Sequence, residues 1–570
     1  MSVRSTSALA LAALLGSASM AFAQAAKPKE LPLKYAARPT TEEITAADLM
    51  SRLYAFADDS LMGREVGTKG NDMGTAIIEA EVRRLGLVPA GDSGTYFQNL
   101  PLFNSYIDPA SMVHIGDQMM TLGADFMAIP REERRVSLDG VPVVYGGNMA
   151  DSTTWISPDA AADRILVLTI PSTSSPIPQS GPGMRSRVAG AAAVFLVSLD
   201  RLPANVKQQL MRLQSLKTDA APPAGAPTFF ISQRFANLMF GSIDSAKTGA
   251  AGKPLSGAIV LKQEQAPGRN VVAILPGSDP KLKGQYVAIG AHNDHIGMRV
   301  QGGVDHDSMR VYNAIARPQG ADSPNPQNLT DVQKTRIKTA LDSLRALHPA
   351  RLDSTYNGAD DDGSGSMSVL EIAESFAKSK VKPKRSIIFV WHAGEEKGLW
   401  GSEYFTDHPT IPRDSIVAQL NMDMVGRGAA TDATGESATR SLLYGGPGYL
   451  QLVGSRRLST ELGDLMESVN TAGKFGLRFD YGMDTNGHPQ NIYCRSDHYE
   501  YARYGIPIVF MTTGGHSDYH QVTDEPQYID YAHMSVIARY VKEAAMTIAN
   551  LDHRIVVDKP KPDPKGRCVQ

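Results

Sequence analysis

Short apolar segments of strand length recur from residue 270 onward, separated by segments of helical periodicity. The strand-like segments fall at 270–275, 286–291, 386–391, 416–422 and 508–511. Helical periodicity is found at 366–378 and 534–548. Uninterrupted apolar runs of this length are typical of strands buried on both faces, and their alternation with helices favours a mostly parallel, twisted sheet flanked by helices. We therefore expect an α/β fold for this part of the chain.

Acidic residues and histidines stand at or shortly after the ends of these strands, or at the start of the following helix. They are His292, Asp294, Asp360, Asp361, Asp362, Glu395, Glu396, Asp423 and His520. Each segment by itself has a structural explanation, such as a turn or carboxylates at a helix N-terminus. Together they lie where open parallel sheets bind ligands, and charges buried there need a partner or a metal ion. The sequence therefore indicates a site at this edge of the sheet.

The donor types in this set fit zinc. The chain has two cysteines, which cannot supply a Cys-type zinc site, so a metal ion must be held by histidines and carboxylates. Two histidines and three carboxylates suit zinc, and one bridging carboxylate would allow two ions. The net charge is −3 with both signs mixed along the chain, which argues against a nucleic-acid partner.

Two segments differ in composition from the α/β part. Residues 130–262 contain short β-rich runs split by proline, glycine and serine, which predicts a separate inserted domain. Residues 298–353 form a long polar insertion with an expected helix at 330–347. Because this insertion leaves the chain just after His292, we expect it to lie at the mouth of the site.

The two ends of the chain have their own patterns. Residues 1–23 combine a positive charge, an apolar stretch and an Ala-Phe-Ala ending, typical of a signal peptide cleaved after Ala23. The expected location is periplasmic or secreted, with no membrane association after cleavage. Residues 553–570 are rich in proline and charge, and we expect a flexible tail there. The two cysteines, Cys494 and Cys568, could pair in an oxidising compartment.

Five motifs occur in a defined order. They are His292-x-Asp294, Gly358-Ala359-Asp360-Asp361-Asp362-Gly363-Ser364-Gly365, Glu395-Glu396-x-Gly398, Asn421-Met422-Asp423-Met424, and Tyr519-His520 with Asp524. In these motifs the sequence resembles the co-catalytic zinc exopeptidases, which include bacterial leucyl-type aminopeptidases, glutamate carboxypeptidases and the transferrin receptor. The resemblance implies a discontinuous zinc peptidase domain at 24–129 and 263–552. The segment 130–262 resembles the protease-associated domain often inserted at this place.

The resemblance also implies a role for each matched residue. His292 and Asp423 would hold one zinc ion, Glu396 and His520 a second, and Asp361 would bridge the two. Glu395 would be the general base and Tyr519 a donor to the oxyanion. Asp294 would accept the other ring N–H of His292 and so fix its tautomer, and Asp524 would lie behind the ligands. His295 neighbours a ligand but matches no ligand position, and it is expected either to support a ligand or to be structural.

The function implied is hydrolysis of N-terminal residues from peptides by a zinc-activated water, with two zinc ions per chain. A carboxypeptidase of the same fold would need cations to bind the substrate carboxylate, and Arg427 is one candidate. A glutaminyl cyclase is a second alternative, although such enzymes generally use one zinc ion. A receptor-like binding module without activity would show broken ligand sets, and all five motifs are intact. We expect the insertion 298–353 to restrict substrates to short peptides, and the oligomeric state stays open.

Overall fold

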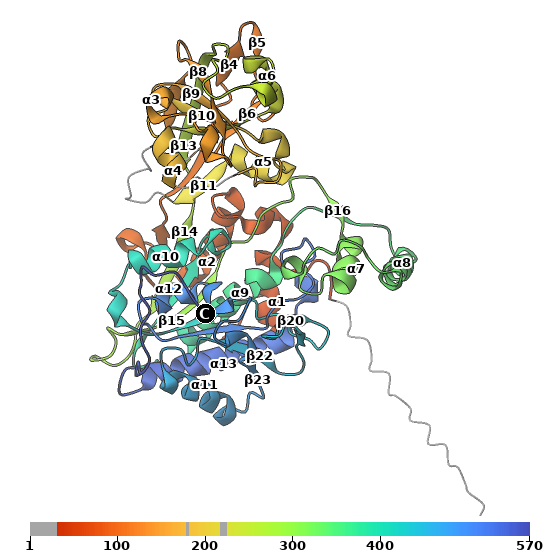
Figure 1. Ribbon diagram of the computed structural model, residues 1–570. Helices are drawn as coiled ribbons and strands as arrows, with labels where there is room; N and C mark the ends of the chain where they lie inside the picture. The colour runs from red at the N-terminus through yellow and green to blue at the C-terminus, as the bar shows by residue number, and fades with distance from the viewer. Residues whose placement is uncertain (1–30, 131, 178–181, 217–224) are drawn as a thin grey trace, which may run out of the picture.

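A computed structural model describes residues 31–130, 132–177, 182–216 and 225–570 (Figure 1). The expected signal peptide, 1–23, lies outside the described residues. Within them, we find no helix with the length and apolar character needed to cross a lipid bilayer.

The main domain is built on a nine-stranded sheet. Its strand order is β1-β14-β18-β15-β19-β24-β22-β23, and β2 also pairs with β14. The strands are β1 (Val88–Pro89), β2 (Phe97–Asn99), β14 (Arg269–Leu275), β15 (Tyr286–His292), β18 (Ser386–His392), β19 (Ile416–Met422), β22 (Tyr449–Val453), β23 (Arg478–Asp480) and β24 (Ile508–Thr512). The four central strands, β18, β15, β19 and β24, are parallel, whereas β14 and β22 run antiparallel to their inner neighbours. The expectation of a mostly parallel α/β sheet is confirmed.

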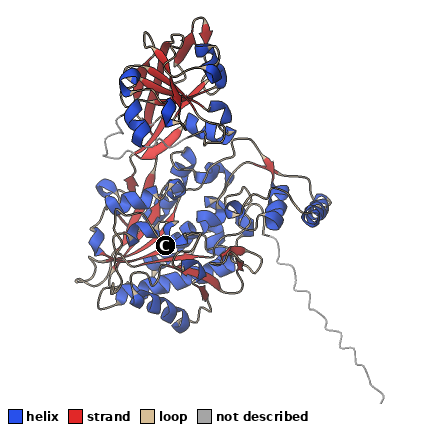
Figure 2. Cartoon of the chain, in the orientation of Figure 1, coloured by secondary structure: helices blue, strands red, loops and turns tan. Residues whose placement is uncertain are grey.

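Helices lie on both sides of the sheet (Figure 2), and alternate side chains of the central strands pack against them. In β15, Val287 and Ile289 belong to the larger apolar core, whereas Ala288 belongs to the smaller one on the opposite face. The first face is covered by α1 (Ala46–Phe56), α2 (Lys69–Arg84), α9 (Gly365–Lys378), α11 (Thr460–Ala472) and α13 (Tyr531–Asn550), and the second by α10 (Trp400–Asp407) and α12 (His498–Ala502). Burial on both faces explains why these strands read as continuous apolar runs.

Several helices start at residues that cap them. The Thr45 side chain accepts the backbone N–H of Asp48 at the start of α1, and Asp530 accepts that of His533 at the start of α13. Such caps satisfy N–H groups that have no partner inside the helix. The start of α9 differs, because the acidic loop Ala359–Ser364 precedes it and carries candidate site residues.

The inserted unit begins earlier in the chain than the expected boundary at residue 130. It contains two sheets and lies above the main domain in Figure 1. One sheet contains β6 (Phe126–Ala128), β12 (Thr228–Ile231), β10 (Ala193–Val197), β9 (Ile165–Thr169) and β8 (Val143–Asn148). The other contains β11 (Leu213–Leu216), β3 (Leu102–Ile107), β13 (Ser256–Gln265), β4 (Met112–Ile115), β5 (Gln118–Met119) and β7 (Arg134–Ser137). Its helices are α3 (Pro158–Ala161), α4 (Pro182–Val188), α5 (Ala204–Met211) and α6 (Gln233–Phe240).

The inserted unit starts before the expected boundary at residue 130, because strands before this residue pair with strands far along the chain. Residues of β3 are in register with β13, and β6 is in register with β12. The inserted unit therefore spans 102–265, and its helices make it an α/β unit rather than one of strands alone. Its identity as a protease-associated domain stays a prediction.

The insertion 298–353 forms a short β-ribbon and two helices beside the main domain. They are β16 (Val304–Asp305), β17 (Leu352–Asp353), α7 (His306–Ala316) and α8 (Asp331–Arg345). Glu525 anchors the base of the insertion, because its carboxylate lies 2.7 Å from the His306 Nε2 atom and accepts two hydrogen bonds from Arg351, at 2.7 and 2.6 Å. Helix α8 projects outward, and none of its described side chains is buried (Figure 1).

We expected a flexible tail at 553–570; most of its side chains are exposed, but several contacts attach it to the main domain. Cys494 and Cys568 form a disulfide with a Cα–Cα distance of 5.8 Å. The Gln570 side chain accepts the backbone N–H of Tyr493 at 2.9 Å and donates to the Met483 carbonyl at 2.5 Å. These tertiary contacts outweigh the polar, proline-rich composition on which the expectation rested.

The disulfide closes a loop of 74 residues, which yields a stability prediction. In the chain-entropy model a loop of this length contributes about 4 kcal/mol to the free energy of unfolding. We expect the C494S/C568S variant to unfold at clearly lower denaturant concentration than the oxidised wild type. Reduction with a thiol should lower the wild-type midpoint and leave the variant unchanged. Equal midpoints for wild type and variant would contradict the prediction.

Candidate metal centre

The carboxyl ends of the four central strands bring together the side chains that the sequence separates. His292 is the last residue of β15, and Asp423 directly follows β19. Glu396 lies in the turn after β18, and His520 lies in the loop after β24. Asp361 reaches the same point from the loop before α9. All five predicted ligands therefore meet at one edge of the sheet.

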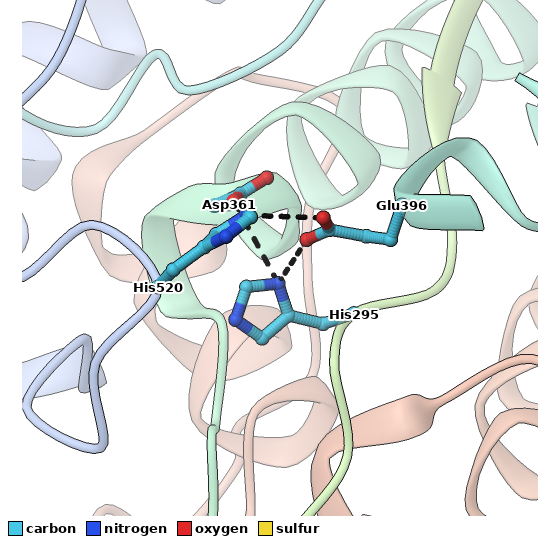
Figure 3. A group of neighbouring side chains, drawn as sticks. All are labelled: His295, Asp361, Glu396 and His520. Atoms are coloured by element: carbon cyan, nitrogen blue, oxygen red, sulfur yellow. Dashed lines mark ion pairs between the residues drawn. The ribbon is translucent and has the colours of Figure 1, made fainter. Parts of the chain in front are cut away.

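These residues form two groups that share one carboxylate. One group contains His292, Asp361 and Asp423, and the other contains His295, Asp361, Glu396 and His520. Within each group the potential ligand atoms lie within 4.8 Å of one another. Figure 3 shows the second group, with the four side chains converging from different segments.

Asp361 has the geometry of a bridging residue. Its Oδ1 atom lies 3.2 Å from His292 Nε2, and its Oδ2 atom lies 2.9 Å from His520 Nε2. Each oxygen thus faces a different group. On the first side the His292 Nε2 atom is also 3.6 Å from Asp423 Oδ1, and on the second side His520 Nε2 is 3.0 Å from Glu396 Oε2.

The donor atoms fit zinc, because several buried ones have no other use in the structure. Among the described residues, none offers a hydrogen-bonding partner of suitable geometry to His292 Nε2, His520 Nε2, Asp361 Oδ2 or Glu396 Oε1. Buried polar atoms are rarely left without partners. Imidazole nitrogens and carboxylate oxygens are also the donors that zinc accepts in proteins. The arrangement is that of two groups of potential metal ligands sharing Asp361.

Two neighbouring carboxylates hold the acidic loop in place. Asp524 accepts the backbone N–H groups of Asp360 and Asp361 at 3.0 and 3.1 Å. The Asp362 carboxylate accepts those of His292 at 3.1 Å and Met424 at 3.2 Å, and so ties the loop to the ends of β15 and β19. Asp524 therefore lies where it was expected, behind the candidate ligands, and its hydrogen bonds fix the position of Asp361.

Asp294 has a different contact from the one expected. The His292 Nδ1 atom is 3.1 Å from the backbone oxygen of Asp294 and 3.7 Å from its carboxylate. The carboxylate instead accepts the backbone N–H groups of Gly394 at 2.8 Å and Glu395 at 3.1 Å. The backbone carbonyl is thus placed to set the His292 tautomer, and the side chain holds the turn that carries both glutamates.

His295 lies within the second group of potential ligands, although it matches no ligand position in the motifs. Its Nδ1 atom lies 2.7 Å from Glu396 Oε1 and 3.7 Å from Asp361 Oδ2, and the side chain is fully buried. The only sequence signal was its place three residues after His292, at the end of the same strand. Its contact with Glu396 assigns it at least the task of orienting that carboxylate.

Adjacent glutamates have opposite electrostatic environments. Burial raises the pKa of Glu395 well above its usual range, and Asp423 and Glu396 raise it further. Burial and Asp361 also act to raise the pKa of Glu396, but His520 and His295 outweigh them and lower it to about 2. Glu396 therefore stays ionised, as a metal ligand must, whereas Glu395 has the higher affinity for a proton.

Two buried arginines position the loops of the site. Arg64 donates to the backbone oxygens of Asn357 and Gly358, at 2.6 and 2.9 Å, just before the acidic loop. Arg427, considered above as a grip for a substrate carboxylate, instead donates to Asp518 at 3.1 Å and is itself buried. Neither had a distinctive sequence pattern, because their partners lie far along the chain or are backbone atoms.

A cavity opens beside the candidate ligands. Its walls include Asp361, Glu395, Asp423, Tyr519 and His520. The Tyr519 ring stacks on the His520 ring with a centroid distance of 4.1 Å. Burial raises the pKa of Tyr519 well above its usual range, so the hydroxyl keeps its proton. Glu395 and Tyr519 are thus both within reach of a molecule bound at the metal sites.

Part of the chain is similar to known peptidases. Residues 338–545 match peptidase family M28. Leucine aminopeptidase 1 of Pyrenophora tritici-repentis is 28% identical over 219 residues, which are 36% of this chain and 50% of that protein. The leupeptin-inactivating enzyme 1 of Streptomyces exfoliatus is 39% identical over 80 residues, or 14% and 18% of the two chains. The chain thus spans about half the length of the leucine aminopeptidases it matches.

Solved structures with similarity to this chain include two bacterial aminopeptidases. The aminopeptidase from Aneurinibacillus sp. strain AM-1 has a TM-score of 0.44 and 15% identity, with 91% of this chain and 98% of that chain covered. The zinc aminopeptidase from Bacillus subtilis also has a TM-score of 0.44 and 15% identity, with 89% and 95% covered.

The two histidines of the second group should differ in their effect on bound zinc. His520 Nε2 lies 2.9 Å from Asp361 and 3.0 Å from Glu396, whereas His295 Nδ1 lies 2.7 Å from Glu396 but 3.7 Å from Asp361. We expect H520Q to lose about half of the zinc held by the wild type. H295Q should bind the full amount at saturation with an affinity lower by roughly 10- to 100-fold. Metal analysis after equilibrium dialysis measures both, and equal zinc loss in the two variants would instead make His295 a ligand.

Proposed function

We propose that this member of the co-catalytic zinc exopeptidase family is an aminopeptidase that hydrolyses the first peptide bond of peptides with a free N-terminus. The observation that carries the proposal is the shared Asp361, which joins two ligand groups beside Glu395 and Tyr519 in one cavity. The chain covers only part of its named relatives, so its activity is inferred chiefly from this site.

The residues that would hold two zinc ions are His292, Asp423 and Asp361 on one side, and Glu396, His520 and Asp361 on the other. Bound zinc would polarise the scissile carbonyl and lower the pKa of the attacking water. The protein itself holds the candidate ligands in place. Asp524 accepts the backbone N–H of Asp361, and the Asp294 carboxylate accepts that of Glu395, next to Glu396.

Glu395 is the residue placed to move a proton. Its Oε2 atom lies 4.0 Å from His292 Nε2, and its carboxyl group faces the cavity. It is not needed as a ligand, because the two groups are complete without it. We assign Glu395 the transfer of a proton from the attacking water to the leaving amine.

Tyr519 is the residue placed to stabilise negative charge on the carbonyl oxygen. Its hydroxyl accepts a hydrogen bond from Arg495 at 3.3 Å, so its own proton is free to donate. A neutral donor aimed at the place where charge develops lowers the barrier without reorganisation.

The cavity walls favour a substrate with an apolar first residue. Met424, Met483, Ile492 and Phe510 supply apolar surface next to the site. Burial of an aliphatic or aromatic side chain against such a surface contributes about 1.5–3 kcal/mol. Gln319 of the insertion also lines the cavity, which supports the proposal that 298–353 restricts substrates to short peptides.

The alternatives fit less well. A carboxypeptidase needs a free cation in the cavity, but Arg427 is bound to Asp518, and Arg495, which does line the cavity, is paired with Asp322. A cyclase with one zinc ion leaves the shared Asp361 unexplained, and a receptor needs none of these groups. We also propose that the expected signal peptide directs the protein to the periplasm or the exterior.

The substrate class can be tested with paired chromogenic amides. We expect the purified protein to cleave leucine p-nitroanilide and to cleave its N-acetylated counterpart at least ~100-fold more slowly, because acetylation removes the free amine. A chelator should abolish the activity, and added zinc should restore it. Preference for the acetylated amide, or activity indifferent to the chelator, would exclude the aminopeptidase.

The role of Glu395 can be tested by removing its ability to take a proton. We expect E395Q to retain the zinc content of the wild type and to lower kcat by roughly 10²- to 10⁴-fold. The control is E403Q on α10, an exposed glutamate that does not line the cavity, which should keep wild-type kcat. A fully active E395Q variant with bound zinc would remove Glu395 from the mechanism.

A further inference from the structure

We infer that the insertion 298–353 supplies a positioning residue for the reaction, a conclusion that rests on the proposed function. Asp322 holds Arg495, and Arg495 in turn holds the hydroxyl group of Tyr519 in the cavity. The insertion would then be part of the catalytic apparatus as well as a wall at its mouth.

The contacts form a chain of three side chains. Arg495 Nη1 donates to Asp322 Oδ2 at 2.8 Å, and Arg495 Nη2 donates to Asp322 Oδ1 at 3.1 Å. This two-point contact fixes the plane of the guanidinium group. The same Nη2 atom donates to the Tyr519 hydroxyl at 3.3 Å. All three residues line the cavity that contains Glu395 and Asp361.

The backbone of the insertion also contacts Tyr519 directly. In the short turn Gly320–Asp322, the backbone N–H of Ala321 donates to the backbone carbonyl oxygen of Tyr519 at 3.0 Å. A Cβ atom on Gly320 would lie 2.4 Å from that oxygen and 2.9 Å from the Tyr519 nitrogen, and Gly320 has a φ of +54°. Only glycine fits such an approach, so the turn is in close contact with Tyr519 at both its backbone and its hydroxyl.

The direction of the hydrogen bond gives the contact its function. Arginine has donors only, so the hydroxyl oxygen of Tyr519 must accept the hydrogen bond from Arg495. The hydroxyl proton is then excluded from that side and can donate to an oxygen bound in the cavity. Without Arg495 the hydroxyl can rotate, and without Asp322 the guanidinium loses the partner that fixes its plane.

A purely stabilising role is a poor account of this pair. The side chains of Arg495 and Asp322 are both 34% exposed. Ion pairs exposed to this degree contribute little to the free energy of unfolding. The base of the insertion is also anchored elsewhere, by Glu525 with His306 and Arg351. Loss of the pair should therefore leave the fold intact and act on Tyr519.

The test compares kcat and KM for leucine p-nitroanilide in the full-length, zinc-loaded protein. We expect Y519F to lower kcat by roughly 10²- to 10³-fold, as for other oxyanion donors. R495M should lower kcat by roughly 10- to 100-fold and D322N by roughly 5- to 20-fold, with KM changed less than ~3-fold. In the Y519F background R495M should change kcat by less than ~2-fold, because the side chain through which it acts has lost its hydroxyl.

A charge swap separates positioning from stability. The D322R/R495D variant can restore an ion pair, but it places an acceptor where the Tyr519 hydroxyl needs a donor. We expect its melting temperature and zinc content to match the wild type while its kcat stays as low as that of R495M. The matched control is D342N, which removes an exposed pair with Lys338 on α8 and should keep wild-type kcat.

Three results would overturn the inference: independent effects of R495M and Y519F, an effect on KM alone, or restored kcat in the charge swap. A wild-type protein without activity on the unblocked amide would remove the proposed function itself, and the inference would fall with it. These outcomes are distinguishable, because the first three require an active wild type.

Discussion

The concentration of negative charge at the carboxyl edge of the central sheet is the constraint on which the rest of the main domain depends. Asp361, Glu396 and Asp423 are largely buried within a few ångströms of one another, with Glu395 beside them. Carboxylates buried together without positive charge are strongly unfavourable. Histidines and metal ions are what can balance them at this place. Even without ions, Asp423 and its neighbouring carboxylates outweigh the effect of burial and raise the pKa of His292.

The surrounding structure is organised to hold that charge in a fixed geometry. Arg64 binds the backbone before the acidic loop, and Asp524 binds the backbone within it. Ser496 donates to the Asp423 carboxylate at 2.7 Å from the segment that follows the disulfide at Cys494. The tail is thus joined, through the Cys494–Cys568 disulfide, to the segment whose Ser496 holds the Asp423 carboxylate.

The sequence predicted the elements whose pattern is local. Strands such as β15 and β19 are buried on both faces, so each is a continuous apolar run that can be recognised without its neighbours. The five predicted ligands meet because each follows such a strand or opens a helix. Their roles as zinc ligands stay predictions, as does the role of Glu395.

Features set by distant pairing could not be predicted in the same way. The start of the inserted unit depends on the pairing of β3 with β13, more than 150 residues away in the chain. The order of the tail depends on Cys568 and Gln570 finding partners in the main domain. His295 and the Asp294 carboxylate had recognisable positions, but their contacts depend on how the turn after β18 folds back.

The order of the strands also sets when the centre can form during synthesis. Domains fold as units as the chain emerges, and a site cannot assemble before its last segment is available. Here β15 supplies a ligand early, whereas β24 inserts next to β19 late and is followed by His520. A nascent chain that stops before this loop has Asp361 and Glu396 but lacks the histidine that faces both. The topology therefore delays completion of the candidate metal centre until nearly the whole main domain has been made.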